Sequence, residues 1–181
     1  MEAESPDTRM APYDPEAPRV FEELAQVLEQ MLPEGARLEH VGSTSIPGVA
    51  GKGIIDCLII VQPDQAAQVA ATVWEAGFDD DIEIRHPNQK WWYAAGSFVR
   101  PNGERRHVHM HISYAGAGFA ADLVRFRDYL RARPEEARRY ERLKRRWRRE
   151  AGDDRRKFTS LKTPYVQGVL ARARREESEP A

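Results

Sequence analysis

The segment 39–60 constrains this chain more than any other, because it joins a glycine-serine turn to an acid framed by aliphatic residues. An apolar stretch ends at Val41, Gly42-Ser43 follows, and a second apolar run over residues 54–61 carries Asp56. Two neighbouring strands would bring the turn amides and this carboxylate together. Backbone amides in such a turn bind an anion, and a carboxylate holds a hard cation against it. The segment therefore predicts phosphate chemistry.

A row of three histidines marks the segment 105–113, where polar and apolar residues alternate. On a strand, His107, His109 and His111 project from one face, with about 6.5 Å between successive members. Two neighbouring imidazoles can then bind one transition metal, and imidazole suits zinc, manganese, nickel or iron better than magnesium. The alternative is a polar face that is exposed to solvent, or that stacks against phosphate without a metal.

Several short motifs occur in the order that one known family uses. They are Glu39-His40-Val41-Gly42-Ser43-Thr44, Pro47-Gly48, Lys52, Ile55-Asp56, His107-Val108-His109 and, nearer the C-terminus, Tyr140, Leu143-Lys144, Phe158, Lys162 and Tyr165. With these motifs the chain resembles the GrpB family of nucleotidyltransferase-fold proteins, from Tyr13 to about Arg175. The resemblance implies an α+β fold, with a nucleotidyltransferase-like mixed β-sheet core, flanking helices and a C-terminal helical region.

The motifs and the resemblance together nominate three sets of site residues. For catalysis they nominate Asp56, His109 and His40, and the role of His40 is open between a ligand, an acid and a packed residue that bonds the loop. For the phosphates or base of a nucleotide they nominate Gly42, Ser43, Thr44, Lys52, Lys144, Lys162 and Tyr165. For a divalent metal (Mg, Mn or Zn) they nominate Asp56, His107, His109 and His111. The alternatives are an ordinary turn for Ser43 and ordinary surface positions for the lysines. We expect no organic cofactor.

One position departs from polymerising nucleotidyltransferases, which usually carry a second acid two residues after the first. Here that position is Leu58. Residues two apart on a strand share a face, so Leu58 stands where the second metal carboxylate is expected. The usual two-metal clamp therefore cannot form. Either other ligands replace it, or no nucleotide is transferred.

Three functions are compatible with these features. The first is a metal-dependent nucleotidyltransferase-like protein that binds a nucleoside triphosphate and transfers a nucleotidyl group to an acceptor that the sequence does not identify. The second is a non-catalytic nucleotide- or RNA-binding module on a degenerate nucleotidyltransferase fold, which Leu58 favours. The third is a metal-dependent phosphohydrolase using the histidine row, which ranks last because such sites normally bring further acids.

A net charge of −1 hides a basic C-terminal half. From Ala121 to Arg175 the chain has 19 Lys and Arg against 8 Asp and Glu. Basic helices attract polyanions, so RNA or another polyanion is an expected partner beside the nucleotide. The same composition is typical of solvated helices whose arginines pair with acids. The sequence does not determine an oligomeric state.

Length and composition fit a single globular domain. With 181 residues, 41% of them hydrophobic, the chain can bury one ordinary core. No apolar run approaches the roughly 20 residues that cross a bilayer, and the acidic N-terminus lacks the basic and apolar regions of a signal peptide. The single cysteine, Cys57, lies in an apolar run and is expected to be a small buried residue. We therefore expect a cytoplasmic protein that does not contact membranes.

Periodicity and turn residues predict the elements. We expect one domain over residues 13–175, with an α/β core over 13–118 and C-terminal helices over 119–175. A mobile arm over residues 1–12 precedes it, and residues 176–181 form a frayed tail. The core contains, in order, a helix opened by Asp14-Pro15, strands over 36–41 and 54–61, a helix from Pro63 to Gly77, a strand over 81–86, and a hairpin of 90–100 with 104–114. Helices follow over 119–133, 134–151 and 155–175, the last kinked or delayed by Pro164.

Overall fold

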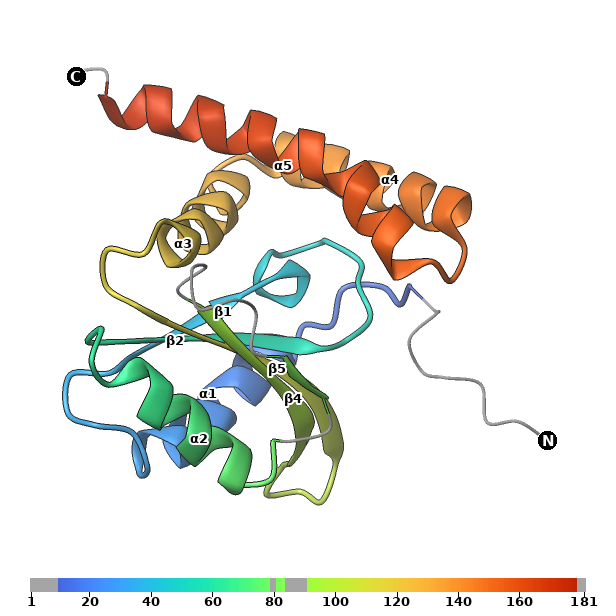
Figure 1. Ribbon diagram of the computed structural model, residues 1–181. Coiled ribbons are helices and arrows are strands. Elements are labelled where there is room, and N and C mark those ends of the chain that lie inside the picture. Colours follow the sequence, from blue (N-terminus) through green and yellow to red (C-terminus); the bar gives the residue numbers. More distant parts are fainter. Residues whose placement is uncertain (1–9, 79–80, 84–90, 179–181) are drawn as a thin grey trace.

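The computed structural model describes residues 10–78, 81–83 and 91–178, and its centre is one mixed sheet (Figure 1). The strands are β1 (Arg37–Val41), β2 (Ile55–Val61), β3 (Asp81–Glu83), β4 (Trp91–Val99) and β5 (Arg105–Tyr114), in the spatial order β1-β2-β5-β4-β3. β2 and β5 run parallel, and the other described neighbours are antiparallel. The strand that carries Asp56 therefore lies directly beside the strand that carries the histidine row.

Helices cover both faces of this sheet (Figure 1). α1 (Ala17–Glu29) and α2 (Ala66–Glu75) lie on one face, and α3 (Gly118–Arg131), α4 (Pro134–Ala151) and α5 (Arg155–Ser178) lie together on the other. A short 3-10 helix, η1 (Ser43–Ser45), follows β1. The predicted α+β class, with a mixed sheet core, flanking helices and a C-terminal helical region, is confirmed.

Alternation along β2 decides which residues face which helices, because successive side chains on a strand point to opposite faces. Cys57 and Ile59 are buried in the core that α1 and α2 form with the sheet, as expected for this cysteine. Leu58 and Ile60 pack on the other face, against α3. Asp56 shares this second face, so it points towards the C-terminal helices.

The C-terminal helices have a core of their own. Tyr140 and Trp147 of α4 and Val169 of α5 are buried together. Ile46 and Val49, from the loop that follows η1, belong to the same cluster. The loop is therefore held between the sheet and the helices, and the basic helices come to lie over the glycine-serine turn.

The described residues at the two ends of the chain make contacts with the rest of the domain. Ala11, predicted to lie in a mobile arm, exchanges two backbone hydrogen bonds with Gly51, at 2.8 and 3.0 Å. Residues 176–178, predicted to fray, belong to α5, where Glu177 accepts hydrogen bonds from Arg125 and Glu176 accepts one from Arg133. Residues 1–9 and 179–181 lie outside the description, so the prediction for them stays a prediction.

The remaining elements agree closely with the predicted ranges. α4 begins at Pro134 as predicted, and α5 continues through the exposed Pro164, which neither ends nor delays the helix. The predicted strand over 81–86 is described only as far as Glu83. Over the described ranges, no helix has both the length and the apolar character needed to cross a membrane. The cytoplasmic location stays a prediction.

Candidate functional site

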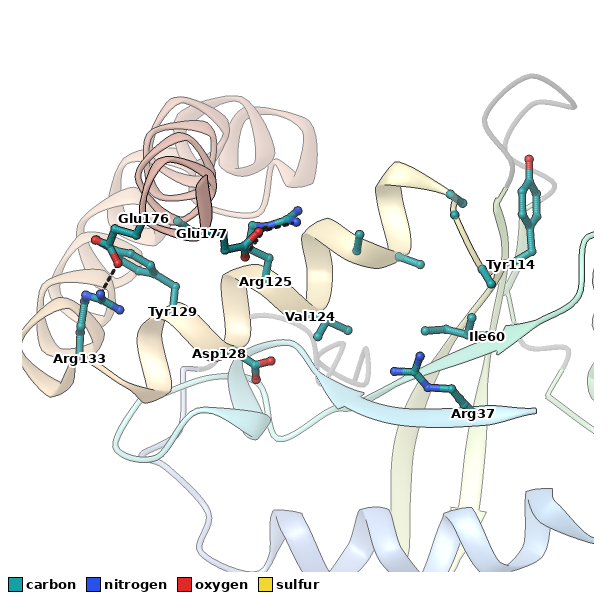
Figure 2. A pocket seen from close by; sticks show the side chains of 16 residues that line it. Arg37, Ile60, Tyr114, Val124, Arg125, Asp128, Tyr129, Arg133, Glu176 and Glu177 are labelled. Carbon is teal, nitrogen blue, oxygen red and sulfur yellow. Dashed lines mark hydrogen bonds and ion pairs between the residues drawn. The ribbon is translucent and has the colours of Figure 1, made fainter. Parts of the chain in front are cut away.

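Each of two cavities in the described part of the chain could hold a small molecule. The larger one, about 640 Å³, lies between α3, the end of α5 and the edge of the sheet (Figure 2). Two of its arginines already pair with acids, Arg125 with Glu177 at 2.8 Å and Arg133 with Glu176. None of the described residues that line it belongs to the predicted site. This cavity is therefore not the candidate.

The second cavity, about 500 Å³, falls within the range of sizes typical of ligand sites. We call it the turn cavity, because the turn after β1 forms part of its wall. Eight of the predicted site residues line it: Gly42, Ser43, Lys52, Asp56, His109, His111, Lys144 and Lys162. The fold thus gathers residues from a loop, two strands and two helices around one space.

Strand pairing brings Asp56 to the turn. β1 and β2 are antiparallel with Val41 opposite Asp56, so the turn that follows Val41 lies over this carboxylate. Gly42 has a φ of 70°, a conformation that favours glycine. The absence of a side chain at Gly42 lets the backbone of the turn approach the carboxylate closely.

Asp56 is held by two imidazoles from β5. The parallel register sets Asp56 beside His109 and Leu58 beside His111. His109 Nδ1 donates to Asp56 Oδ1 at 3.2 Å, and His111 Nε2 lies 3.5 Å from the same oxygen. Burial alone would raise the pKa of the Asp56 carboxyl, but these two imidazoles hold it well below its usual range. The carboxylate therefore stays ionised at neutral pH.

The predicted metal ligands do not form a metal centre in this arrangement. His107 is exposed and does not line the turn cavity, and the other two imidazoles are directed at one Asp56 oxygen. Within the described ranges, no three His, Cys, Asp or Glu side chains are placed to hold one ion. Leu58 is fully buried, so no second carboxylate takes its place. The donor set does not fit a divalent metal.

Positive charge dominates the turn cavity instead. Five cationic side chains line it, namely Lys52, Lys144, Arg148, Arg155 and Lys162, and Asp56 is the one carboxylate among the described lining residues. Arg148 and Arg155 were not among the predicted site residues. Their spacing could have identified them, because Arg148 follows Lys144 by one helical turn and Arg155 precedes Lys162 by two turns. Each arginine is therefore expected on the same helix face as the nominated lysine.

Lys144 is the most deeply buried of these cations, with 6% of its surface exposed. Its Nζ donates to the carbonyl oxygen of Ala50 at 2.7 Å, which fixes the amine beside the turn. Burial and the nearby charge of Lys162 lower the pKa of Lys144 to about 7. Burial also lowers the pKa of Lys162. Both amines are thus held in a site that disfavours unbalanced positive charge.

His40 and Thr44 hold the turn from behind and do not line the cavity. His40 stacks on Phe21 with 4.9 Å between ring centroids, and its Nε2 lies 3.1 Å from Thr44 Oγ1. Thr44 Oγ1 in turn donates to the carbonyl oxygen of Ile54 at 3.0 Å. Of the roles left open for His40, the structure places it as a packed residue that bonds the loop.

Two arginines of α3 also fix the turn, and sequence reasoning did not single them out. Arg127 donates to the carbonyl oxygen of His40 at 3.0 Å, and Arg131 donates to that of Ser45 at 2.7 Å. Ser45 Oγ closes the turn by donating to the carbonyl oxygen of Gly42 at 2.7 Å. These contacts bring α3 against both ends of the turn.

Tyr165 lies behind the cavity wall rather than in it. Its ring stacks on Tyr140 at 5.5 Å with an interplanar angle of 6°, and its hydroxyl donates to Glu136 Oε1 at 2.8 Å. Tyr140 does line the turn cavity, as do Trp91, Phe119 and Phe158. Trp91 and Phe119 have ring centroids 4.2 Å apart. Aromatic surface thus faces the same space as the cations.

Comparison with known proteins identifies the family. The chain is 30% identical over 164 residues to a UPF0157 protein of Halalkalibacterium halodurans, covering 89% of this chain and 80% of that one. It is 35% identical over 138 residues to a UPF0157 protein of Deinococcus radiodurans, covering 76% of this chain and 68% of that one. The crystal structure of the conserved protein GrpB from Enterococcus faecalis matches with a TM-score of 0.77 and 28% identity, over 94% of this chain and all of that one. The sequence profile of the family described as GrpB protein matches residues 7–172, and the chain therefore belongs to the GrpB family.

Proposed function

We propose that this protein binds a nucleoside triphosphate in the turn cavity, with the phosphate chain against Gly42-Ser43. The observation that carries this proposal is the charge of the wall, where five cationic side chains face one carboxylate among the described lining residues. Ammonium and guanidinium groups donate strong hydrogen bonds to phosphate oxygens. Backbone amides of a turn add further donors without adding charge.

The aromatic side chains support a nucleotide rather than phosphate alone. Trp91 and Phe119 present paired rings on the sheet side of the cavity, and Phe158 and Tyr140 line its helical side. A nucleobase stacks on such rings with little dependence on its identity. The cavity therefore combines a cationic region for phosphates with an apolar region for a base.

Nucleotidyl transfer to an acceptor is the second candidate function, and the closeness of Asp56 to the turn favours it. In that reaction an acceptor oxygen bonds to the α-phosphorus, the bond to the bridging β-phosphate oxygen breaks, and pyrophosphate leaves. Lys144 and Lys162 would stabilise the charge that develops on the leaving pyrophosphate. Buried Leu58 counts for binding without transfer, because it leaves Asp56 without a second acid.

RNA or another polyanion is proposed as a further partner. Four of the five cavity cations come from α4 and α5, so polyanion binding on these helices would lead directly to the cavity. Arginines of the basic half also pair with acids, as Arg148 does with Asp153, Arg145 with Glu141 and Arg172 with Glu136. We propose the cavity mouth as the region of contact, because cations of both helices meet there.

Calorimetric titration with ATP, GTP, CTP and UTP, each with magnesium, manganese or zinc, tests the proposal. We expect saturable binding of at least one nucleotide, about tenfold weaker in Lys144→Met because a charged hydrogen bond is lost. Lys157→Met, which changes an exposed lysine of α5, is the control and should bind as the unaltered protein does. Absence of binding for all four nucleotides with every ion contradicts the proposal. Pyrophosphate release on adding RNA would establish the second candidate.

A further inference from the structure

We infer that the turn cavity binds the phosphate chain of its ligand without a divalent cation, because lysine and arginine side chains supply the charge that metal ions supply elsewhere. The inference rests on the proposed function, and it specifies the form of the ligand, a metal-free polyphosphate. It follows from a mismatch between the few metal-binding groups of the site and its many cationic groups.

The metal-binding groups are few and already engaged. Asp56 is the one carboxylate among the described lining residues, and its Oδ1 faces His109 Nδ1 at 3.2 Å and His111 Nε2 at 3.5 Å. A metal ion at Asp56 would have to displace these contacts. The position two residues further along β2 is filled by Leu58, which is 0% exposed and packs against α3. The strand therefore offers no second oxygen ligand on this face.

The cationic groups approach the cavity from three directions. Lys52 comes from the loop before β2, Lys144 and Arg148 from successive turns of α4, and Arg155 and Lys162 from α5. Residues four or seven apart lie on one face of a helix, so each helix turns a cationic face to the cavity. A phosphate chain in the middle would reach donors on several sides at once.

Gly51 shows how closely the turn and α4 meet. A Cβ built at Gly51 would lie 2.5 Å from Ser43 Oγ and 3.7 Å from Lys144 Nζ. The serine hydroxyl and the lysine amine thus converge across a residue without a side chain. Ala11 pairs with Gly51 through two backbone hydrogen bonds and so holds this residue in place. One phosphate group between Ser43 and Lys144 would be within reach of both donors.

The buried amines gain most from an anion. Removal from water disfavours their charged forms, and burial accordingly lowers the pKa of both Lys144 and Lys162. A bound phosphate would stabilise both ammonium groups. A divalent cation in the same place would instead add positive charge to a wall that already carries an excess of it.

Two pairs of neighbouring arginines provide matched controls. Arg148 and Arg155 line the cavity, whereas their neighbours Arg149 and Arg156 do not. Arg148 is half-buried, and the other three are exposed. Each substitution to methionine removes one positive charge from the same helix. Net charge therefore changes equally within each pair, but Arg148→Met also removes an ion pair with Asp153 at 3.3 Å.

The experiment is a titration of the full chain with ATP and with inorganic tripolyphosphate, once in EDTA and once in magnesium. We expect affinity in EDTA to stay within about threefold of that in magnesium. In EDTA, Arg148→Met and Arg155→Met should each weaken binding about tenfold, and Arg149→Met and Arg156→Met should leave it unchanged. Circular dichroism of each variant verifies that it is folded.

Three outcomes would overturn the inference, and they differ in what they say of the proposed function. Binding in magnesium that disappears in EDTA overturns the inference and leaves the proposed function intact. Equal weakening by all four substitutions shows general attraction to a basic surface and overturns the specific cation site. Absence of binding in both media removes the proposed function itself, and the inference with it.

Discussion

A Cβ atom placed on Gly42 would lie 2.1 Å from Oδ2 of Asp56, well inside the limit for any contact between real atoms. The turn and the carboxylate are therefore packed directly against each other. Asp56 cannot move away freely, because His109 and His111 hold its other oxygen. The shape of the turn cavity depends on this contact.

Replacement of Gly42 by alanine tests the contact, and Gly53 provides the control. Both glycines have positive φ, 70° and 73°, but nothing lies within 4 Å of a Cβ at Gly53. Gly53→Ala should cost about 1 kcal/mol of unfolding free energy for its backbone conformation alone. Gly42→Ala should cost about 2 kcal/mol more, because the added methyl forces Asp56 to move. Urea denaturation measures both, and equal costs would show that Asp56 yields without strain.

His40 should make stability depend on pH in the acid range. Burial, with the charges of Arg131 and Arg127, lowers the pKa of this imidazole from 6.5 to about 4 in the folded chain. Between those values the unfolded chain binds a proton that the folded chain does not, so the free energy of unfolding falls as pH falls. The slope from this group is about 1.4 kcal/mol per pH unit. In His40→Gln this component should vanish, and the same slope in both proteins over pH 6.5 to 4 would contradict the assignment.

Ligand binding should take up a proton at Lys144. In the free protein the pKa of this amine is lowered to about 7 by burial and by the charges of Lys162 and Lys52, which Asp56 and Glu141 oppose. A bound phosphate raises that pKa, so affinity should fall as pH rises above about 7. Calorimetry at slightly alkaline pH, in two buffers of different ionisation enthalpy, measures the proton uptake. Identical heats in the two buffers, or the same uptake in Lys144→Met, would refute it.

Introduction of the acid that is absent at position 58 should destabilise the chain rather than create a metal centre. Leu58 is fully buried and packs with Val41 and Ala120, an apolar setting in which an ionised carboxylate is costly. Leu58→Asp should therefore lose about 3 kcal/mol or more of unfolding free energy, whereas Leu58→Met should lose less than about 1.5 kcal/mol. Thermal unfolding with and without manganese measures this. A folded Leu58→Asp protein that manganese stabilises strongly would contradict the account.

The sequence predicts the strands of the site because the residue pattern that identifies each strand lies within the strand itself. The alternation of His109 and His111 with apolar residues determines a shared face, and the apolar run around Asp56 marks a buried neighbouring strand. Pairing of these two strands follows from the fold that the motifs imply. Accordingly the expected meeting of aspartate and imidazole is found in the structure, at 3.2 Å.

The helical part of the site depends on how α4 and α5 pack against the rest of the domain, and no short sequence pattern determines that packing. Many arginines of the basic half look alike in the sequence, yet Arg148 lines the cavity while Arg149 does not. The direction of His40 is equally non-local, because it is set by stacking on Phe21. Sequence reasoning therefore nominated His40 and Tyr165 for the site and did not separate Arg148 from the other basic residues of the helices.

The most direct test of the central claim is a crystal structure of this chain with a non-hydrolysable ATP analogue. The account predicts that the phosphates lie in the turn cavity, with their oxygens in hydrogen-bond reach of Ser43 Oγ and Lys144 Nζ. Phosphates bound in the larger cavity, beside Arg125 and Arg133, would contradict it.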